Sequence, residues 1–371
     1  MKKVILIFGF IVLLIACSSN DDKNTSPSNN YDRTALLTNW ADNIIIPSFE
    51  NYQAKIQVLV DNTTAFTGSP TEVSLQTLRT SWLDAYKAYQ YVAMYNFGKA
   101  DEVSFRETTN IYPTDVAGIQ SNITSGNYNL TLQAQFVRQG FPALDYLING
   151  LGTTDAEIVG FYTINANAAG YKTYLTAVSG RLKTNADAIL ADWKSGYRDA
   201  YVGSNGTTVS SSVNVTTNNF VKFMERDVRS AKVGIPAGLL SAGVTFPEKV
   251  EGFYKSDVSK DLLLVAVKAA QDFFNGKHFD SATTGEGLKT YLDYLNADRD
   301  GQKLSAIINN QFVAVTTISN TLNSNFSQQI FSDNTKMVAA YNVIQQNVVY
   351  VKLDMMQALN ITIDYVDGDG D

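Results

Sequence analysis

The sequence contains very few of the side chains that most often serve catalysis and metal binding. Its 371 residues include one cysteine, Cys17, and one histidine, His278. A zinc site of the usual kind needs several histidine or cysteine ligands, and a serine nucleophile needs a base. His278 lies in a polar segment without a nucleophile motif, so we interpret it as a solvated loop residue. Pairs of carboxylates could still act as acid and base, but no spacing singles out one pair.

Long apolar runs are also scarce. The longest, residues 4–15, is too short for a membrane-spanning helix, which needs roughly 20 apolar residues. It follows two lysines and fits the apolar region of a signal peptide. Residues 14–17, Leu-Ile-Ala-Cys, resemble a lipobox, with small Ala16 before the lipid-bearing Cys17. We therefore predict a signal peptide over residues 1–16 and lipidation of Cys17; the alternative is an ordinary secretory signal.

Lipidation of Cys17 would leave a chain without thiols or disulfides, stabilised by core burial alone. Residues 18–32 are polar and almost free of apolar side chains, so we predict a flexible tether over residues 17–32. Loss of residues 1–16 removes two lysines and changes the net charge from −7 to −9. This acidic balance argues against a nucleic-acid partner. We expect an outer-membrane lipoprotein of the cell envelope, on the periplasmic face or the cell surface.

From residue 33 onward, apolar residues recur at three- and four-residue steps, as in Leu36, Trp40 and Ile44, which predicts an all-α fold. Helical runs are expected over residues 131–148, 166–193, 220–233, 259–274, 285–295, 304–326 and 335–359. They are too many for one four-helix bundle, so we predict two, over residues 33–200 and 201–371. Pro47 should kink or split its run. Residues 209–215 are interpreted as a loop that leads into a helix.

Two acidic stretches resemble calcium loops. Residues 296–301 (Asn-Ala-Asp-Arg-Asp-Gly) match the start of an EF-hand loop, but its twelfth position is Ile307 rather than a bidentate glutamate. A turn between helices accounts for this stretch better, because Asp and Gly favour turns. Residues 367–371 are interpreted as a frayed acidic tail.

Five motifs, in order along the chain, resemble the imelysin-like family. They are residues 82–98 ending in Phe-Gly, 110–113 (Asn-Ile-Tyr-Pro), 140–147 (Gly-Phe-Pro-Ala-Leu-Asp-Tyr-Leu), 227–238 and 247–254. The resemblance covers about residues 35–365. It implies two four-helix bundles with a functional site at their interface, and cell-envelope proteins linked to bacterial iron acquisition. Such proteins would have envelope uptake proteins as partners.

The sequence departs from the family at its signature motif, Gly-x-His-x-x-Glu. The histidine position is Pro142 and the glutamate position is Asp145. The family was once grouped with metallopeptidases, but proline offers no ligand atom and the imidazole has no replacement. We therefore expect no catalytic residues. Asp145 can either face a cleft or favour the N-terminal end of a helix.

The matching motifs place a ligand site between the bundles. Its predicted residues are Trp82, Asn110, Tyr112, Pro113, Gly140, Phe141, Asp145, Arg229, Lys232 and Glu251. Charged groups brought together there form either a satisfied ion network or a binding site. No cofactor is required by the sequence; scarce His, Cys and Met disfavours haem ligation, so iron would be held by oxygen ligands or as a chelate. We expect a non-catalytic protein of iron or haem acquisition, with a surface glycan- or partner-binding scaffold and a peptidase as alternatives.

Overall fold

Helices form nearly all the regular structure in residues 30–365, the part of the chain that this computed structural model describes. Within that range the strands are Asp298–Arg299 (β1) and Gln302–Lys303 (β2), which pair as a short antiparallel hairpin. The all-α prediction is therefore confirmed. The predicted signal peptide, the lipidation site at Cys17, the tether up to residue 29 and the acidic tail 367–371 lie outside the described residues.

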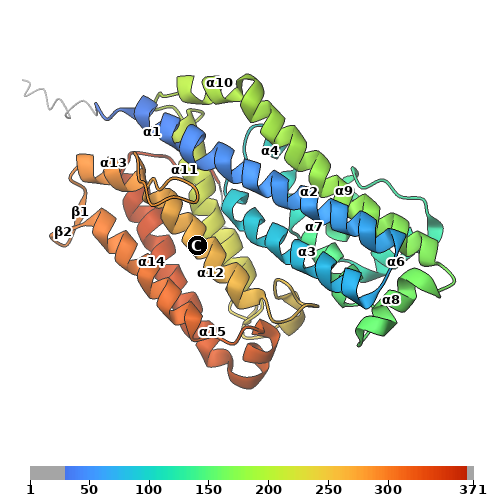
Figure 1. The fold of residues 1–371 in the computed structure, drawn as a ribbon. Coiled ribbons are helices and arrows are strands. Elements are labelled where there is room, and N and C mark those ends of the chain that lie inside the picture. The colour runs from blue at the N-terminus through green and yellow to red at the C-terminus, as the bar shows by residue number, and fades with distance from the viewer. Residues whose placement is uncertain (1–29, 366–371) are drawn as a thin grey trace, which may run out of the picture. The chain divides into compact units, whose positions relative to one another are not determined.

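The first group of long helices is built around α2. Its members are α2 (Ile46–Gly68), α3 (Glu72–Val92), α7 (Gly140–Asn149) and α9 (Ala168–Asp192). Helix α2 packs against α3 and α9, and α7 packs against the same two helices (Figure 1). Tyr52, Ile56 and Leu59 on α2 are fully buried, because spacing by three and four residues places them on one helix face.

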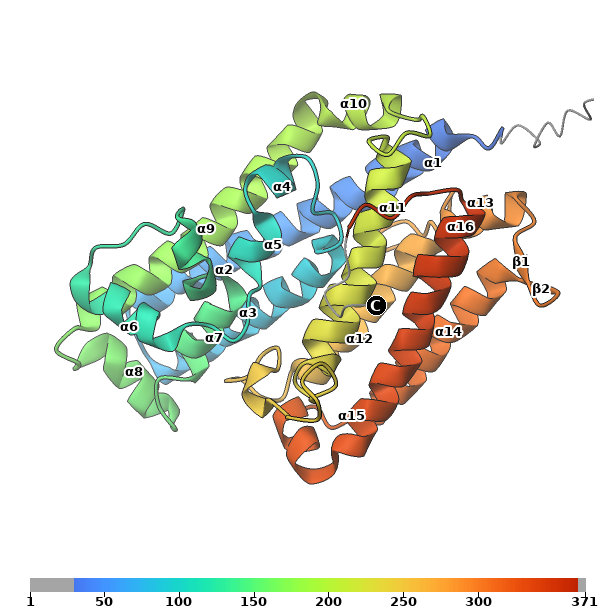
Figure 2. The same ribbon diagram turned by 180° about the vertical axis from the view of Figure 1, so that it is seen from behind.

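The second group contains the C-terminal helices. Its members are α11 (Ser212–Lys222), which continues into the π-helical η4 (Phe223–Gly234), α12 (Ser259–Phe274), α14 (Leu304–Asn320) and α15 (Phe326–Val349). Helix α15 packs against η4 and α14, and α12 packs against the same two (Figure 2). Helix α12 also packs against α3 of the first group, where Lys87 Nζ lies 3.1 Å from Asp261 Oδ2.

Shorter elements connect and cover these helices. They are α1 (Arg33–Asn39), η1 (Trp40–Ile45), α4 (Lys99–Glu102), α5 (Phe105–Thr109), α6 (Val116–Ser125), η2 (Gln133–Arg138), α8 (Asp155–Thr163), η3 (Trp193–Tyr197), α10 (Arg198–Gly203), η5 (Pro247–Lys249), α13 (Leu288–Tyr294), η6 (Tyr350–Met355) and α16 (Met356–Ala358). The predicted domain boundary after residue 200 falls within α10. Tyr31, placed in the tether by its sequence, is buried and stacks on Tyr291 with ring centroids 4.0 Å apart.

Pro47 lies in the first turn of α2, and the helical run from α1 through η1 into α2 continues past it. The fixed φ of proline suits a helix, but within this continuous run its missing N–H leaves the carbonyl four residues earlier without a helical donor. The carbonyl of Asn43, four residues earlier, instead accepts a hydrogen bond from the N–H of Phe279 at 2.8 Å. The helix therefore avoids a break by bonding to a loop far along the chain.

Several other segments follow their predicted structure only in part. The run 131–148 is divided into η2 and α7 by extended Gln139 and by Gly140, whose φ is +77°. The loop predicted over residues 209–215 ends at residue 211, and residues 212–215 already belong to α11. Residues 296–301, predicted as a turn between helices, lie between α13 and α14 and contain strand β1 and the hairpin turn at residues 300–301. Over residues 30–365, no cluster of three potential metal-ligating side chains occurs, and no helix combines the length and apolarity needed to cross a membrane.

Candidate functional site

The centre of the candidate site is Glu251, a carboxylate whose residue is only 1% exposed. It accepts hydrogen bonds from Asn110 Nδ2 at 2.8 Å and Gln90 Nε2 at 3.3 Å. It also forms an ion pair with Lys232 Nζ, which is equally buried. Gln90 lies on α3 and Asn110 follows α5, whereas Lys232 lies on η4. Since a buried charge needs such partners, Glu251 ties the two helix groups together.

A cluster of aromatic rings lies beside this carboxylate. The ring of Tyr86 stacks on Phe141 at 4.4 Å with an interplanar angle of 7°, and its hydroxyl donates to Asn110 Oδ1. Trp82 Nε1 donates to the carbonyl of Phe141 at 3.2 Å. Burial and the nearby Glu251 raise the pKa of Tyr86 well above its usual value. Tyr86 therefore stays protonated and acts as a donor at neutral pH.

Tyr86 and Gln90 are site residues that the sequence reasoning does not single out. They follow Trp82 at intervals of four residues, so all three lie along one face of α3. The same spacing also fits a helix face that packs into the core, because the ring of Tyr86 makes apolar contacts. A polar Gln90 within that stripe is the one signal in the sequence that could have marked it.

Gly140 brings the Asn110 segment against the start of α7. Its φ is +77°, and a β-carbon built at this position would lie 2.2 Å from the carbonyl oxygen of Thr109. Only glycine adopts this backbone without strain and without a clash. The close approach places Asn110, the residue after Thr109, next to Phe141, the residue after Gly140.

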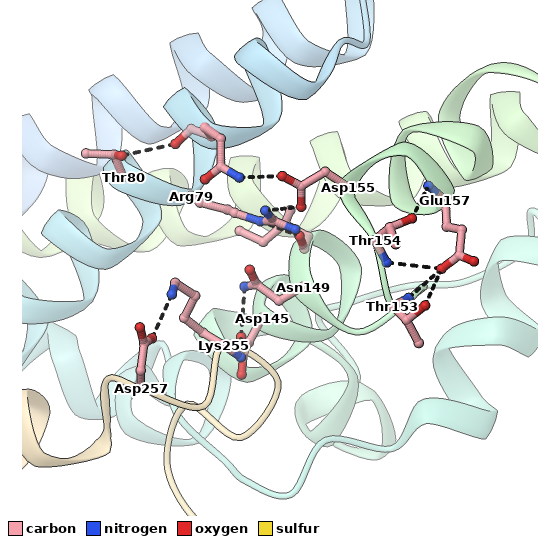
Figure 3. Close-up of polar contacts among 12 residues, drawn as sticks. Arg79, Thr80, Asp145, Asn149, Thr153, Thr154, Asp155, Glu157, Lys255 and Asp257 are labelled. Atoms are coloured by element: carbon pink, nitrogen blue, oxygen red, sulfur yellow. Dashed lines mark hydrogen bonds and ion pairs between the residues drawn. The ribbon is translucent and has the colours of Figure 1, made fainter. Parts of the chain in front are cut away.

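Asp145 is a second buried carboxylate, one turn further along α7. Its Oδ2 accepts the N–H of Tyr254 at 2.9 Å. Its Oδ1 accepts the N–H of Lys255 at 2.9 Å and Asn149 Nδ2 at 3.0 Å, and Figure 3 shows these residues together. Asp145 therefore anchors the segment that carries Glu251, four residues before Lys255. Burial raises the pKa of Asp145 to about 7, although these hydrogen bonds oppose the shift.

This pKa predicts how stability depends on pH. The folded state holds the Asp145 proton more tightly than the unfolded chain, so the contribution of Asp145 to stability falls as pH rises from about 4 to about 7. An Asp145→Asn variant lacks this titration. As the pH rises across that range, we expect the unfolding free energy of wild type to fall relative to that of the variant. A difference that stays constant from pH 4 to pH 8 in urea titrations would contradict the raised pKa.

Two pockets meet at Tyr112, which is half-buried and joined to Pro113 by a cis peptide bond. One, here called the Lys232 pocket, has a volume of about 280 Å³ and is lined by Arg106, Asn110, Tyr112, Asp227 and Lys232 together with apolar residues such as Ile111 and Phe223. The other, the Asp145 pocket, has a volume of about 130 Å³ and is lined by Tyr112, Pro113, Pro142, Asp145, Glu248 and Tyr254 among others. Tyr112 thus lies between the two spaces.

The Lys232 pocket continues toward a third recess of about 420 Å³, with which it shares Ala93, Arg106, Phe223 and Asp227. At this junction Arg106 Nε lies 2.9 Å from Asp227 Oδ1. Asp227 raises the pKa of Arg106, so the guanidinium stays charged. This ion pair joins α5 of the first half to η4 of the second.

Most of the predicted site residues are therefore neighbours. Asn110 and Lys232 bond to Glu251, and Tyr112 lines the Lys232 pocket with them. Trp82 and Phe141 join this cluster through the ring of Tyr86. Gly140 packs closely against Thr109, and Pro113 and Asp145 line the smaller pocket. His278 lies half-buried in the loop after α12. Cys17 lies outside the described residues.

Arg229 belongs to a different buried cluster. Its guanidinium lies 3.7 Å from Glu225 Oε1 and donates to Gln345, while Lys352 Nζ donates to Glu225 at 2.9 Å. Residues three apart share a face in an α-helix, but η4 is π-helical and has more residues in each turn. Arg229 and Lys232 therefore point in different directions.

A family model for imelysin, described as peptidase M75, matches residues 45–350. The chain belongs to the imelysin family. The fold of this family member is similar to that of an imelysin-like protein from Psychrobacter arcticum 273-4, with a TM-score of 0.70 and 17% identity over 90% of this chain and 97% of the other. A protein from Parabacteroides distasonis ATCC 8503, named as an iron-regulated protein A precursor, matches with a TM-score of 0.70 and 15% identity over 87% and 95%. No curated protein matches.

In this imelysin-family chain, Pro142 and Asp145 stand at the positions where the resemblance leads one to expect histidine and glutamate. Pro142 lies buried in the first turn of α7 and lines the Asp145 pocket. Asp145 uses both carboxylate oxygens to hold backbone N–H groups. The geometry at this motif therefore organises a loop and supplies no imidazole.

Proposed function

We propose that this chain is a lipid-anchored protein of the cell envelope that binds a ligand at the Tyr112 pockets and serves iron or haem acquisition without catalysis. The observation that carries the proposal is the buried Lys232–Glu251 pair beside a pocket of mixed polar and apolar lining, built from segments of both helix groups. Pockets lined by a few convergent polar groups are usual ligand sites. The iron-regulated name of one similar structure supports the iron connection.

The chemistry of the Lys232 pocket favours an oxygen-rich chelate. Arg106, Asn110 and Tyr112 line its wall. Arg106 donates to Asp227 and Asn110 donates to Glu251, but a guanidinium has five N–H groups and an amide has two, so each keeps a donor for carboxylate or hydroxyl oxygens. Catalysis has less support, because Gln90, Asn110 and Lys232 already donate to Glu251. A poised base would need a free carboxylate or amine, and Glu251 and Lys232 are paired with each other.

The experiment is a calorimetric titration of the purified chain with ferric citrate, with haemin and with iron-free citrate as comparison probes. We expect saturable binding of ferric citrate and weaker or no binding of haemin, since oxygen-bound iron suits the polar lining. Absence of binding to both iron compounds would contradict the proposal. Zinc-dependent cleavage of casein by the same preparation would contradict its non-catalytic part and favour a peptidase.

Membrane attachment is tested separately. A Cys17→Ala variant should move from the membrane fraction to the soluble fraction, because the only thiol in the sequence is then missing and lipid anchors hold through their buried chains. Metabolic labelling with a tagged fatty acid should mark wild type alone. A variant that remains in the membrane fraction without label would show that another segment provides attachment.

A further inference from the structure

A separate recess of about 460 Å³ lies where α3, α12 and the loop after α12 meet. Here called the Tyr91 groove, it is lined in part by Tyr91, Lys268, Asp272, Lys277, Phe279 and Asp280. It shares no lining residue with the Lys232 or Asp145 pockets. The proposed function leaves this groove unexplained.

The loop that forms one side of the groove is held firmly in place. The N–H of Gly285 donates to the carbonyl of Gly276 at 2.8 Å, and the N–H of His278 donates to Thr283 at 2.9 Å. The N–H of Phe279 bonds to the Asn43 carbonyl that Pro47 leaves without its helical donor. Figure 1 shows this loop beside the helical run that begins with α1.

At the tip of this loop, Asp280 has a φ of +49°, an uncommon conformation for a residue other than glycine. Aspartate adopts this left-handed backbone more readily than most side chains, because its short polar group can bond locally. The loop therefore presents the side chains of Phe279 and Asp280 to the groove in a fixed arrangement. A surface organised before binding loses less entropy when a ligand arrives.

Two half-buried rings form an apolar corner in the groove. Tyr91 and Phe279 meet nearly at right angles, with an interplanar angle of 88° and centroids 5.4 Å apart. The negative face of an aromatic ring attracts positively polarised C–H groups. The corner thus suits a flat ligand that has C–H groups on one side.

Two lysines beside the aromatic corner form ion pairs with the same carboxylate. Lys268 Nζ lies 2.5 Å from Asp272 Oδ2, and Lys277 Nζ lies 3.5 Å from Asp272 Oδ1. An ammonium group has three N–H donors, so each lysine can also donate to a ligand. Asp280 is exposed and offers acceptor oxygens. With two lysines and two aspartates the groove has no net charge, which does not favour a phosphate or another anion.

We propose that the Tyr91 groove binds a neutral oligosaccharide. A sugar ring combines the two properties that the groove matches, a C–H face for the aromatic corner and hydroxyl groups at its edge for fixed donors and an acceptor. The proposal stands on these contacts and is independent of iron binding.

The test is native affinity electrophoresis in gels that contain dextran, mannan or xylan. The wild-type chain should be retarded in at least one of these gels. A Tyr91→Ala variant should bind about tenfold more weakly, the loss expected when an aromatic contact is removed. Lys268→Met, at a side chain that is 54% exposed, should also weaken binding while keeping the fold. Phe331→Ala is the control, since this ring is 89% exposed on α15 and lies outside the groove.

If the wild-type chain were retarded in none of the three gels, the proposal would be overturned. Retardation that Tyr91→Ala and Lys268→Met leave unchanged would also overturn it. Circular dichroism checks that each variant is folded; if Tyr91→Ala does not fold, Lys268→Met decides the outcome. Ferric citrate titrations of the same variants should match wild type, which separates this site from the Tyr112 pockets.

Discussion

A Lys232→Met variant should lose about 3–5 kcal/mol of unfolding free energy, the usual consequence of removing one partner from a buried ion pair. Methionine keeps an unbranched chain of similar length but leaves the charge of Glu251 without its cation. Asn110 and Gln90 would then be the remaining donors to that carboxylate. Urea unfolding followed by circular dichroism measures the loss.

Two comparisons isolate the cause. The double variant Lys232→Met/Glu251→Gln removes both charges and keeps an amide oxygen for Asn110, so it should recover much of the lost stability. Lys99→Met removes a cation from a surface pair with Glu102 and should change stability far less, because exposed ion pairs contribute little. If Lys232→Met were no more harmful than Lys99→Met, the buried pair would not hold the two helix groups together.

Gly140→Ala should destabilise the chain by at least about 3 kcal/mol, because two penalties combine. A left-handed backbone costs a non-glycine residue about 1–2 kcal/mol. The added β-carbon would also lie 2.2 Å from the Thr109 carbonyl oxygen, and backbone atoms must move to relieve that contact. Since Thr109 precedes Asn110, the variant should also weaken ligand binding at the Lys232 pocket.

Gly180→Ala is the matched control for this prediction. Gly180 lies within α9, has no positive φ, and has no atom within 4 Å of a built β-carbon. Alanine there should stabilise the helix by about 0.5–1 kcal/mol. Equal changes at Gly140 and Gly180 would show that the crossing at Thr109 is not tight.

The helical fold could be predicted from the sequence because apolar spacing reports which residues face a core. The run 259–274 matches α12 at both ends. The family motifs predicted that Asn110, Phe141 and Glu251 lie close together, although their segments are far apart along the chain. Spacing alone cannot show contacts between such segments.

Other features depend on backbone geometry that residue patterns do not reveal. The π-helical turns of η4 direct Arg229 toward Glu225 rather than toward Glu251. The predicted run 131–148 is interrupted at Gln139 and Gly140, because an extended residue and a positive φ do not fit within a continuous helix. The Tyr91 groove depends on the bond from Phe279 to Asn43, a contact between segments more than two hundred residues apart.

The central claim is that the space around Tyr112 binds a ligand and is more than a structural junction. The most direct measurement compares ferric citrate binding by wild type, Tyr112→Ala and Tyr294→Ala using calorimetry. Tyr294 is a half-exposed tyrosine on α13 that lines neither Tyr112 pocket, so its loss controls for removal of a phenol. We predict that Tyr112→Ala weakens binding about tenfold or more, as expected for a central tyrosine contact, while its melting temperature stays close to that of wild type. Unchanged affinity with a large fall in melting temperature would contradict the claim and make the Tyr112 region a structural core.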